Sequence, residues 1–146
     1  MREIFTEIDV DAPVDQVWSV LVDIEKWREW NPFIPLISGE VSVGSRLKIR
    51  IEPPGGKPMS FKATVSCVQE NRDFIWVGYI PILGAFRGEH IFELRPIDDS
   101  HTKVIHREEF SGWMLPFLWK NLDKGARAGF QLMNEALKNE VERTDS

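Results

Sequence analysis

The sequence GEHIFELRPIDDSHTKVIHREEFSG occupies residues 88–112 and alternates between apolar and polar residues on both sides of a short polar loop. A period of two is typical of strands, so the pattern predicts strands over 86–95 and 102–110. The loop around Asp99 is short enough to join them as an antiparallel hairpin. Because the apolar residues of both strands fall mainly at even-numbered positions, even-numbered side chains are expected to point into the interior.

Three polar residues of this hairpin share the interior face: His90, His106 and Glu108. With the loop centred on Asp99, His90 lies opposite Glu108. His106 then lies opposite Phe92. Side chains directly opposite each other have Cβ atoms about 4.5–5.5 Å apart, which allows an imidazole and a carboxylate to form a hydrogen bond. A loop centred one residue earlier would place His90 opposite His106 instead, so the cluster forms in either register.

Two interpretations of this polar cluster remain open. In the first, His90 and Glu108 satisfy each other inside a cavity that also holds water, because buried charges persist only when they are paired or hydrated. In the second, a histidine and a carboxylate in an apolar cleft act as general base and acid on a carbonyl compound, which makes His90, His106 and Glu108 candidate catalytic residues. Zinc could bind two histidines and a glutamate, but no partners that would orient the imidazoles are evident, so no metal site is predicted.

Hydrophobic periodicity predicts the elements on either side of the hairpin. The further strands are 4–10, 45–52, 59–68 and 74–80, and the helices are a short one capped by Asp11 and ending at Val22, a second over 24–30 and a long one over 116–143. Gly125 and Gly129 lie in the middle of the long helix, where glycine costs about 1 kcal/mol relative to alanine. Close packing on the sheet, or room for a ligand, would compensate. The order of elements predicts an α+β fold.

Length and composition limit what the chain can be. With 146 residues and 42% hydrophobic content, it is predicted to form a single domain over 1–146. The net charge of -5, without a cluster of Lys or Arg, argues against a nucleic-acid partner. The single cysteine, the charged N-terminus and the lack of a run of about 20 apolar residues favour a cytoplasmic protein without a transmembrane segment. No glycine-rich phosphate loop is evident, so no cofactor is predicted.

Two blocks of the sequence resemble a known superfamily. Residues 11–34, DAPVDQVWSVLVDIEKWREWNPFI, and the hairpin at 88–112 are similar to the START-like (SRPBCC) superfamily, which includes polyketide cyclase or dehydrase-like proteins and Bet v 1-like allergens. The resemblance implies a helix-grip fold, with a curved antiparallel sheet of about seven strands wrapped around the C-terminal helix, two short helices after the first strand and a cavity between sheet and helix. It also implies that Trp76 points into this cavity.

The expected cavity leads to three hypotheses of function. The first is a carrier or sensor for a small hydrophobic, lipid-like or polyketide-like ligand. The second is a polyketide cyclase or dehydratase-type enzyme that uses the His/Glu pair. The third is a protein-interaction module or homodimer, because Ile75, Val77 and Tyr79 make the outer face of one strand apolar. A cover from the segment around Trp113 is the alternative explanation of this apolar face. The apolar loop 81–84 is expected either to cover the cavity or to pack against the C-terminal segment. The residues predicted to contact a ligand are Phe61, Trp76, His90, Phe92, His106, Glu108, Phe110, Gly129, Phe130 and Met133.

Overall fold

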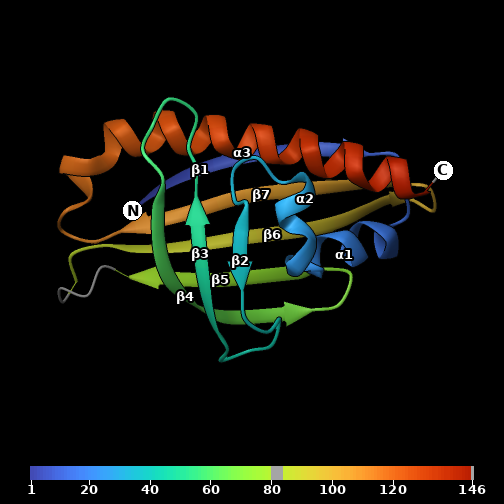
Figure 1. The fold of residues 1–146 in the computed structure, drawn as a ribbon, viewed down its shortest axis with the longest axis horizontal. Coiled ribbons are helices and arrows are strands. Elements are labelled where there is room, and N and C mark those ends of the chain that lie inside the picture. Colours follow the sequence, from blue (N-terminus) through green and yellow to red (C-terminus); the bar gives the residue numbers. More distant parts are fainter. Residues whose placement is uncertain (80–83, 146) are drawn as a thin grey trace.

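One antiparallel sheet curves around the long C-terminal helix in the computed structural model, which describes residues 1–79 and 84–145 (Figure 1). The strands of this described part are β1 Arg2–Val10, β2 Leu36–Ser38, β3 Arg46–Ile51, β4 Met59–Gln69, β5 Asp73–Tyr79, β6 Arg87–Asp98 and β7 His101–Ser111. Their order across the sheet is β1-β7-β6-β5-β4-β3-β2. The helical segments are α1 Val14–Val22, η1 Ile24–Lys26, α2 Trp27–Trp30 and α3 Leu115–Asp145. The predicted helix-grip α+β fold is confirmed.

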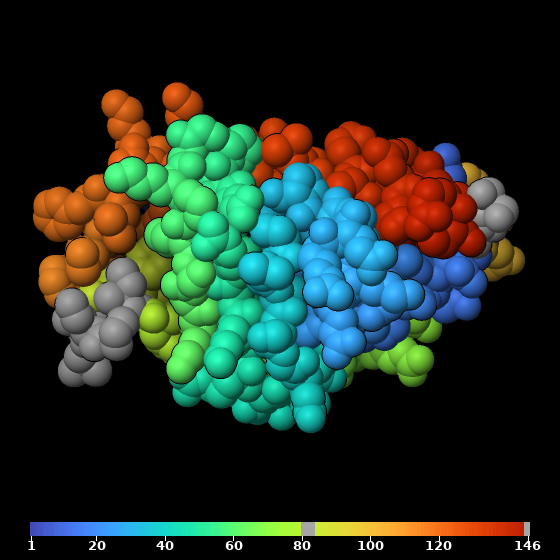
Figure 2. Space-filling view, in the orientation of Figure 1, coloured from blue at the N-terminus to red at the C-terminus, as the bar shows by residue number. Residues whose placement is uncertain are grey.

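Helix α3 lies against one part of the sheet while the other part curves round to meet it. It packs against β1, β7 and α1, and Figure 1 shows it in orange to red, extended along the length of the molecule. Figure 2 shows the segment around residues 50–60, in green, reaching toward the helix on the near face. Pro53 of this segment lies beside Gly125 of α3. Sheet, loop and helix therefore surround a common interior space.

The register of the β6–β7 hairpin is the one predicted from a loop centred on Asp99. His90 pairs with Glu108, and Phe92 pairs with His106. The even-numbered rule also holds, because His90 and His106 are 4% and 0% exposed. The three polar residues of the hairpin therefore lie together on the interior face.

Several details differ from the predictions. Strand β2 was not predicted, because its three residues are too few to show a period of two. The predicted cap at Asp11 is wrong: α1 begins after Pro13 with no side-chain cap, and the Asp11 backbone N–H donates to the Glu142 carboxylate instead. The end of the strand predicted to reach Ile80, and most of the loop at 81–84, lie outside the described residues. Among the described residues, no helix has the length and apolarity needed to cross a membrane.

The two glycines in the middle of α3 have different surroundings. A Cβ atom on Gly129 would overlap the ring of Phe33, so the missing side chain allows this ring to pack directly on the helix. A Cβ on Gly125 would lie 3.5 Å from Pro53, which is an ordinary contact. Close packing therefore accounts for Gly129, but the partner is a ring of the segment between α2 and β2 and not, as had been expected, the sheet.

The outer face of the sheet is less accessible than its apolar sequence suggests. Val77 is 6% exposed and Ile75 is half-buried, although both had suggested a surface for a partner. On the neighbouring strands Ile91 and Ile105 are also buried, and Arg107 lies beside them with ion pairs to three glutamates. Tyr79, at the end of β5, is 63% exposed, so only part of the apolar patch that motivated the interaction hypothesis is accessible.

Candidate functional site

A cavity of about 460 Å³ lies between the concave face of the sheet and the first half of α3. Tyr79, Met59 and Asn121 are exposed lining residues and mark its opening. His90 and Glu108 lie at its inner wall. The lining residues are Phe33, Ile34, Ile51, Pro53, Gly56, Met59, Phe61, Trp76, Gly78, Tyr79, Phe86, Gly88, His90, Glu108, Phe110, Leu118, Asn121, Leu122, Gly125 and Ala126.

Half of the residues predicted to contact a ligand line this cavity, and half do not. Those in the lining are Phe61, Trp76, His90, Glu108 and Phe110. Those outside it are Phe92, His106, Gly129, Phe130 and Met133. The second group forms the layer behind the wall, because all but the glycine are at most 1% exposed and the Phe92 and Phe130 rings stack on the His106 imidazole. Their effect on a ligand would therefore act through the wall residues.

The two buried histidines are joined directly to each other. Their Nε2 atoms lie 2.7 Å apart, which requires one proton between the two nitrogens. The Nδ1 atom of His90 lies 3.3 Å from Oε1 of Glu108, whose side chain is 18% exposed. The His90 ring stacks on Trp76, with centroids 4.5 Å apart. A polar chain therefore leads from the cavity wall into the core.

Two further residues extend this chain and were missing from the sequence-based predictions. The Nδ1 atom of His106 lies 2.8 Å from Oδ1 of Asn134, on α3. The Asn134 amide donates to the Thr6 hydroxyl, and this hydroxyl donates to the His106 carbonyl oxygen. Both residues are buried. The available signal was a polar residue on an apolar face: Thr6 lies between Ile4 and Ile8, and Asn134 follows the buried Met133.

Burial determines the electrostatic state of His106. It lowers the pKa of this imidazole well below the usual value of 6.5, and the neighbouring His90 lowers it further, against the hydrogen bond with Asn134. His106 is therefore neutral around pH 7. In a neutral imidazole one nitrogen donates and the other accepts, so the partners of His106 must fit one of its two tautomers.

Gly88 makes room for the Glu108 carboxylate. A Cβ atom at Gly88 would come within 2.5 Å of Oε2 of Glu108, and both residues line the cavity. The carboxylate therefore occupies the space that any other residue at this position would fill with its side chain. The sequence could not reveal this, because the contact depends on the side-chain conformation of Glu108.

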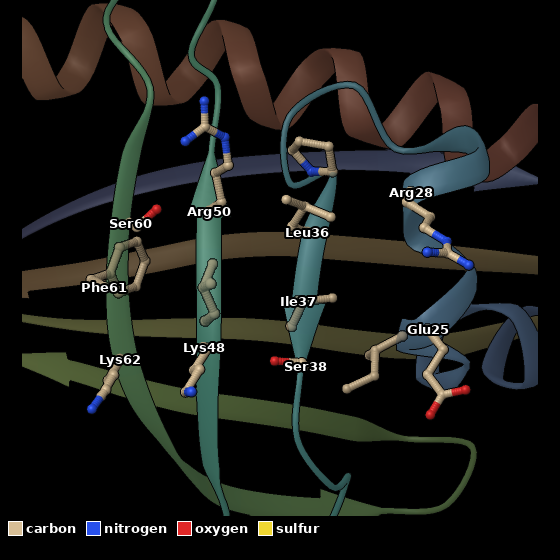
Figure 3. Close-up of a pocket in the computed structure, with 13 residues that line it drawn as sticks. Glu25, Arg28, Leu36, Ile37, Ser38, Lys48, Arg50, Ser60, Phe61 and Lys62 are labelled. Atoms are coloured by element: carbon tan, nitrogen blue, oxygen red, sulfur yellow. The ribbon is translucent and has the colours of Figure 1, made fainter.

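A larger hollow of about 820 Å³ lies outside the sheet, over β2, β3 and β4 and beside the η1–α2 segment. Figure 3 shows its labelled side chains, including Lys48, Lys62 and Arg28, spread over separate elements. These three cations are exposed. Because its charged groups face solvent and do not converge on a buried point, the smaller inner cavity is the better candidate for a binding site. In the described ranges, no three His, Cys, Asp or Glu residues gather in a way that could hold a metal ion.

The fold is shared with solved structures of several kinds. An aromatase/cyclase from Streptomyces sp. R1128 has a TM-score of 0.83 at 14% identity, with 99% of this chain and 96% of that chain covered. A START superfamily protein from Mycobacterium smegmatis has a TM-score of 0.76 at 20% identity, covering 97% and 98%. Norcoclaurine synthase from Thalictrum flavum, in complex with dopamine and hydroxybenzaldehyde, has a TM-score of 0.75 at 16% identity, covering 99% and 88%.

At these identities the likeness concerns the fold alone. No curated protein matches the chain. A family model does match, over residues 1–142, and its description is polyketide cyclase / dehydrase and lipid transport. This match covers nearly the whole chain and agrees with the resemblance of residues 11–34 and 88–112. The chain therefore belongs to the polyketide cyclase / dehydrase and lipid transport family.

Proposed function

We propose that the protein binds a small, largely apolar molecule in the inner cavity, as a carrier or sensor, with the polar end of the ligand at Glu108 and His90. The observation that carries this proposal is the lining. Aromatic and aliphatic side chains form most of the wall, and the polar side chains are confined to the mouth and to one inner corner. Such a distribution is typical of small-molecule sites, where a few polar groups orient an apolar body.

The size of the cavity supports a ligand of modest dimensions. Its volume of about 460 Å³ falls within the range of about 300–1,000 Å³ that is typical of ligand pockets. Norcoclaurine synthase, which shares the fold, was solved with two small aromatic molecules, dopamine and hydroxybenzaldehyde. A family described by lipid transport as well as cyclase chemistry is also consistent with binding as the common property.

A cavity-filling variant tests this proposal. Ala126 lines the cavity from α3, so Ala126→Phe should fill part of it, whereas Gln131→Phe adds the same ring to an exposed position of the same helix. The uncharged fluorescent probe N-phenyl-1-naphthylamine should bind the wild type and Gln131→Phe with similar affinity. It should bind Ala126→Phe about tenfold or more weakly. Solvent extraction of the purified protein, followed by mass spectrometry, should release a lipid-like molecule. Equal binding of the probe by all three proteins would place the binding outside the cavity and contradict the proposal.

A second candidate function is catalysis of the cyclase or dehydratase type. The observation that favours it is the contact between Glu108 and His90 at the cavity wall, because a carboxyl and an imidazole can pass a proton to and from a carbonyl compound. Exchange of the α-protons of a bound ketone in D₂O, measured by NMR, reports this step. The wild type should accelerate the exchange and Glu108→Gln should not, while both bind the probe. No acceleration by the wild type over the buffer would exclude this function for the ketone tested.

A further inference from the structure

We infer that the polar corner of the cavity selects a ligand that ends in a hydrogen-bond donor, an alcohol or phenol hydroxyl, and rejects one that ends in a carboxylate. The inference deepens the proposed binding function and rests on it. It follows from the direction of each hydrogen bond along the chain that runs from Thr6 to Glu108, and from the charges that surround the cavity.

The first link fixes the orientation of the Asn134 amide. The Thr6 hydroxyl donates its only proton to the His106 carbonyl oxygen, at 2.7 Å. It can therefore only accept from its other neighbour, which is the Asn134 side chain at 2.9 Å. Since the amide nitrogen must point to Thr6, the amide oxygen of Asn134 must point to His106.

The second link fixes the tautomer of His106. An amide oxygen only accepts, so the proton of this 2.8 Å contact belongs to His106 Nδ1. His106 is fully buried and neutral, so its Nε2 carries a lone pair. The 2.7 Å contact between the two imidazoles then needs a proton from His90, whose Nε2 is the donor.

The third link leaves one proton between His90 and Glu108. If His90 were neutral and Glu108 ionised, a lone pair of Nδ1 would face a carboxylate oxygen at 3.3 Å, which is repulsive. A proton at this contact, on Nδ1 or on Oε1, removes the repulsion, and either position leaves Oε2 of Glu108 without a proton.

In both protonation states Oε2 of Glu108 remains a hydrogen-bond acceptor. It lies against the backbone of Gly88, and both residues belong to the cavity lining. A hydroxyl group of a ligand can donate to this oxygen. A carboxylate at the same place would bring two acceptors together.

The charges of the wall lead to the same conclusion. Among the described residues that line the cavity there is no lysine or arginine. A protonated His90 would already be paired with the Glu108 carboxylate, so an anionic end group would lose its hydration without gaining an unpaired cation, which is unfavourable in an apolar cavity. A neutral hydroxyl loses much less hydration free energy and gains a hydrogen bond to Glu108.

Matched pairs of compounds test the inference by displacement of N-phenyl-1-naphthylamine at neutral pH. The pairs are 2-naphthol with 2-naphthoate and 1-decanol with decanoate, which differ only in the end group. Each alcohol should bind the wild type about tenfold or more tightly than its carboxylate. Glu108→Gln should weaken binding of the alcohol and so reduce the ratio of the two affinities. Glu109→Gln, a neighbouring carboxylate on the outer face, should leave the ratio unchanged. Gly88→Ala should act like Glu108→Gln, because its methyl group displaces Oε2.

The possible results separate this inference from the function on which it rests. Equal binding of both members of a pair, or tighter binding of the carboxylate, would overturn the inference while the binding function stands. Failure of every compound and of the probe to bind would overturn the binding function and the inference together. ¹⁵N NMR of the imidazoles gives an independent check: His106 should be neutral with its proton on Nδ1, and a proton on Nε2 would break the chain of donors.

Discussion

His106 shows how the surroundings of a single residue determine its charge. Its imidazole is fully buried, the Phe92 and Phe130 rings stack against it, and both of its nitrogens have polar partners. The sequence predicted its interior position, because alternation in a strand fixes the face on which a side chain lies. Its bond to Asn134, 28 residues further along the chain, was not predictable, because it depends on how α3 is rotated over the sheet.

The low pKa of His106 predicts a loss of stability in acid. The unfolded chain takes up a proton below about pH 6.5, whereas the folded chain resists protonation of His106. The contribution of His106 to the free energy of unfolding is thus fully present above about pH 6.5. It is lost as the pH falls toward the pKa of the folded state, by at most about 1.4 kcal/mol per pH unit. Urea unfolding should therefore show that the free energy of unfolding falls less steeply with decreasing pH in His106→Gln than in the wild type.

His101 provides the control for this experiment. It is exposed, and a hydrogen bond from its ring to Asp98 raises its pKa. The contribution of His101 to the free energy of unfolding is therefore present at low pH and is lost as the pH rises. His101→Gln should therefore keep the acid slope of the wild type between about pH 6.5 and 5 or make it steeper. Identical slopes for the wild type and His106→Gln would show that His106 is not the source of the acid sensitivity.

At the scale of elements, the middle of α3 is fitted to the segment that contains Phe33. Periodicity predicted the helix and its apolar stripe, and the two glycines indicated that another part of the protein or a ligand approaches the middle of the helix closely. Only the structure identifies the partner, because Phe33 precedes α3 by about 80 residues and no local pattern links them. Strand β2 was missed for a related reason, since its place in the sheet comes from pairing with β3 and not from its own three residues.

Alanine substitutions at the two glycines should have opposite effects on stability. Gly129→Ala should lower the free energy of unfolding by about 1–3 kcal/mol, because the added methyl group collides with the Phe33 ring. Gly125→Ala meets only an ordinary contact with Pro53, so it should raise stability by up to about 1 kcal/mol through helix propensity. Urea denaturation of both variants measures the difference. Similar effects of the two substitutions would show that Phe33 does not pack against Gly129.

The outer side of β1, β7 and β6 is joined by ion pairs around Arg107. It contacts Glu93 at 2.7 Å, Glu3 at 3.0 Å and Glu109 at 3.1 Å, and only 24% of its side chain is exposed. Arg107→Gln should destabilise the protein by about 1–2 kcal/mol, because it leaves the half-buried Glu93 with fewer partners. Arg95→Gln, which removes an exposed partner of the same carboxylate, should cost less than about 0.5 kcal/mol. Chemical denaturation should rank the two variants in this order.

At the scale of the whole molecule, the first strand pairs with the last one. Strand β1 is an edge strand of the sheet that pairs with β7 and packs against α3, so the N-terminal residues pack with elements of the C-terminal half. The overall arrangement was predictable from the order of elements and from two sequence blocks. The volume of the cavity was not, because it depends on side-chain conformations and on the curvature of the sheet.

This arrangement predicts a single unfolding transition for residues 1–146. Because β1, β7 and α3 come from opposite ends of the chain and pack together, none of them should unfold alone. Far-UV circular dichroism, which follows the backbone, and tryptophan fluorescence, which follows the side chains, should give coincident curves in urea. Two separated transitions would contradict the prediction of one domain.

The contact between Gly129 and Phe33 also has a consequence for ligand choice. The Phe33 ring is shared, with one part packed on the helix glycine and another facing the cavity. Any larger residue at 129 would push this ring, and the space available to a ligand would shrink although no lining residue had changed. Relatives with identical cavity linings can therefore differ in the ligands they accept, and the size limit of the site is partly encoded by a residue that no ligand touches.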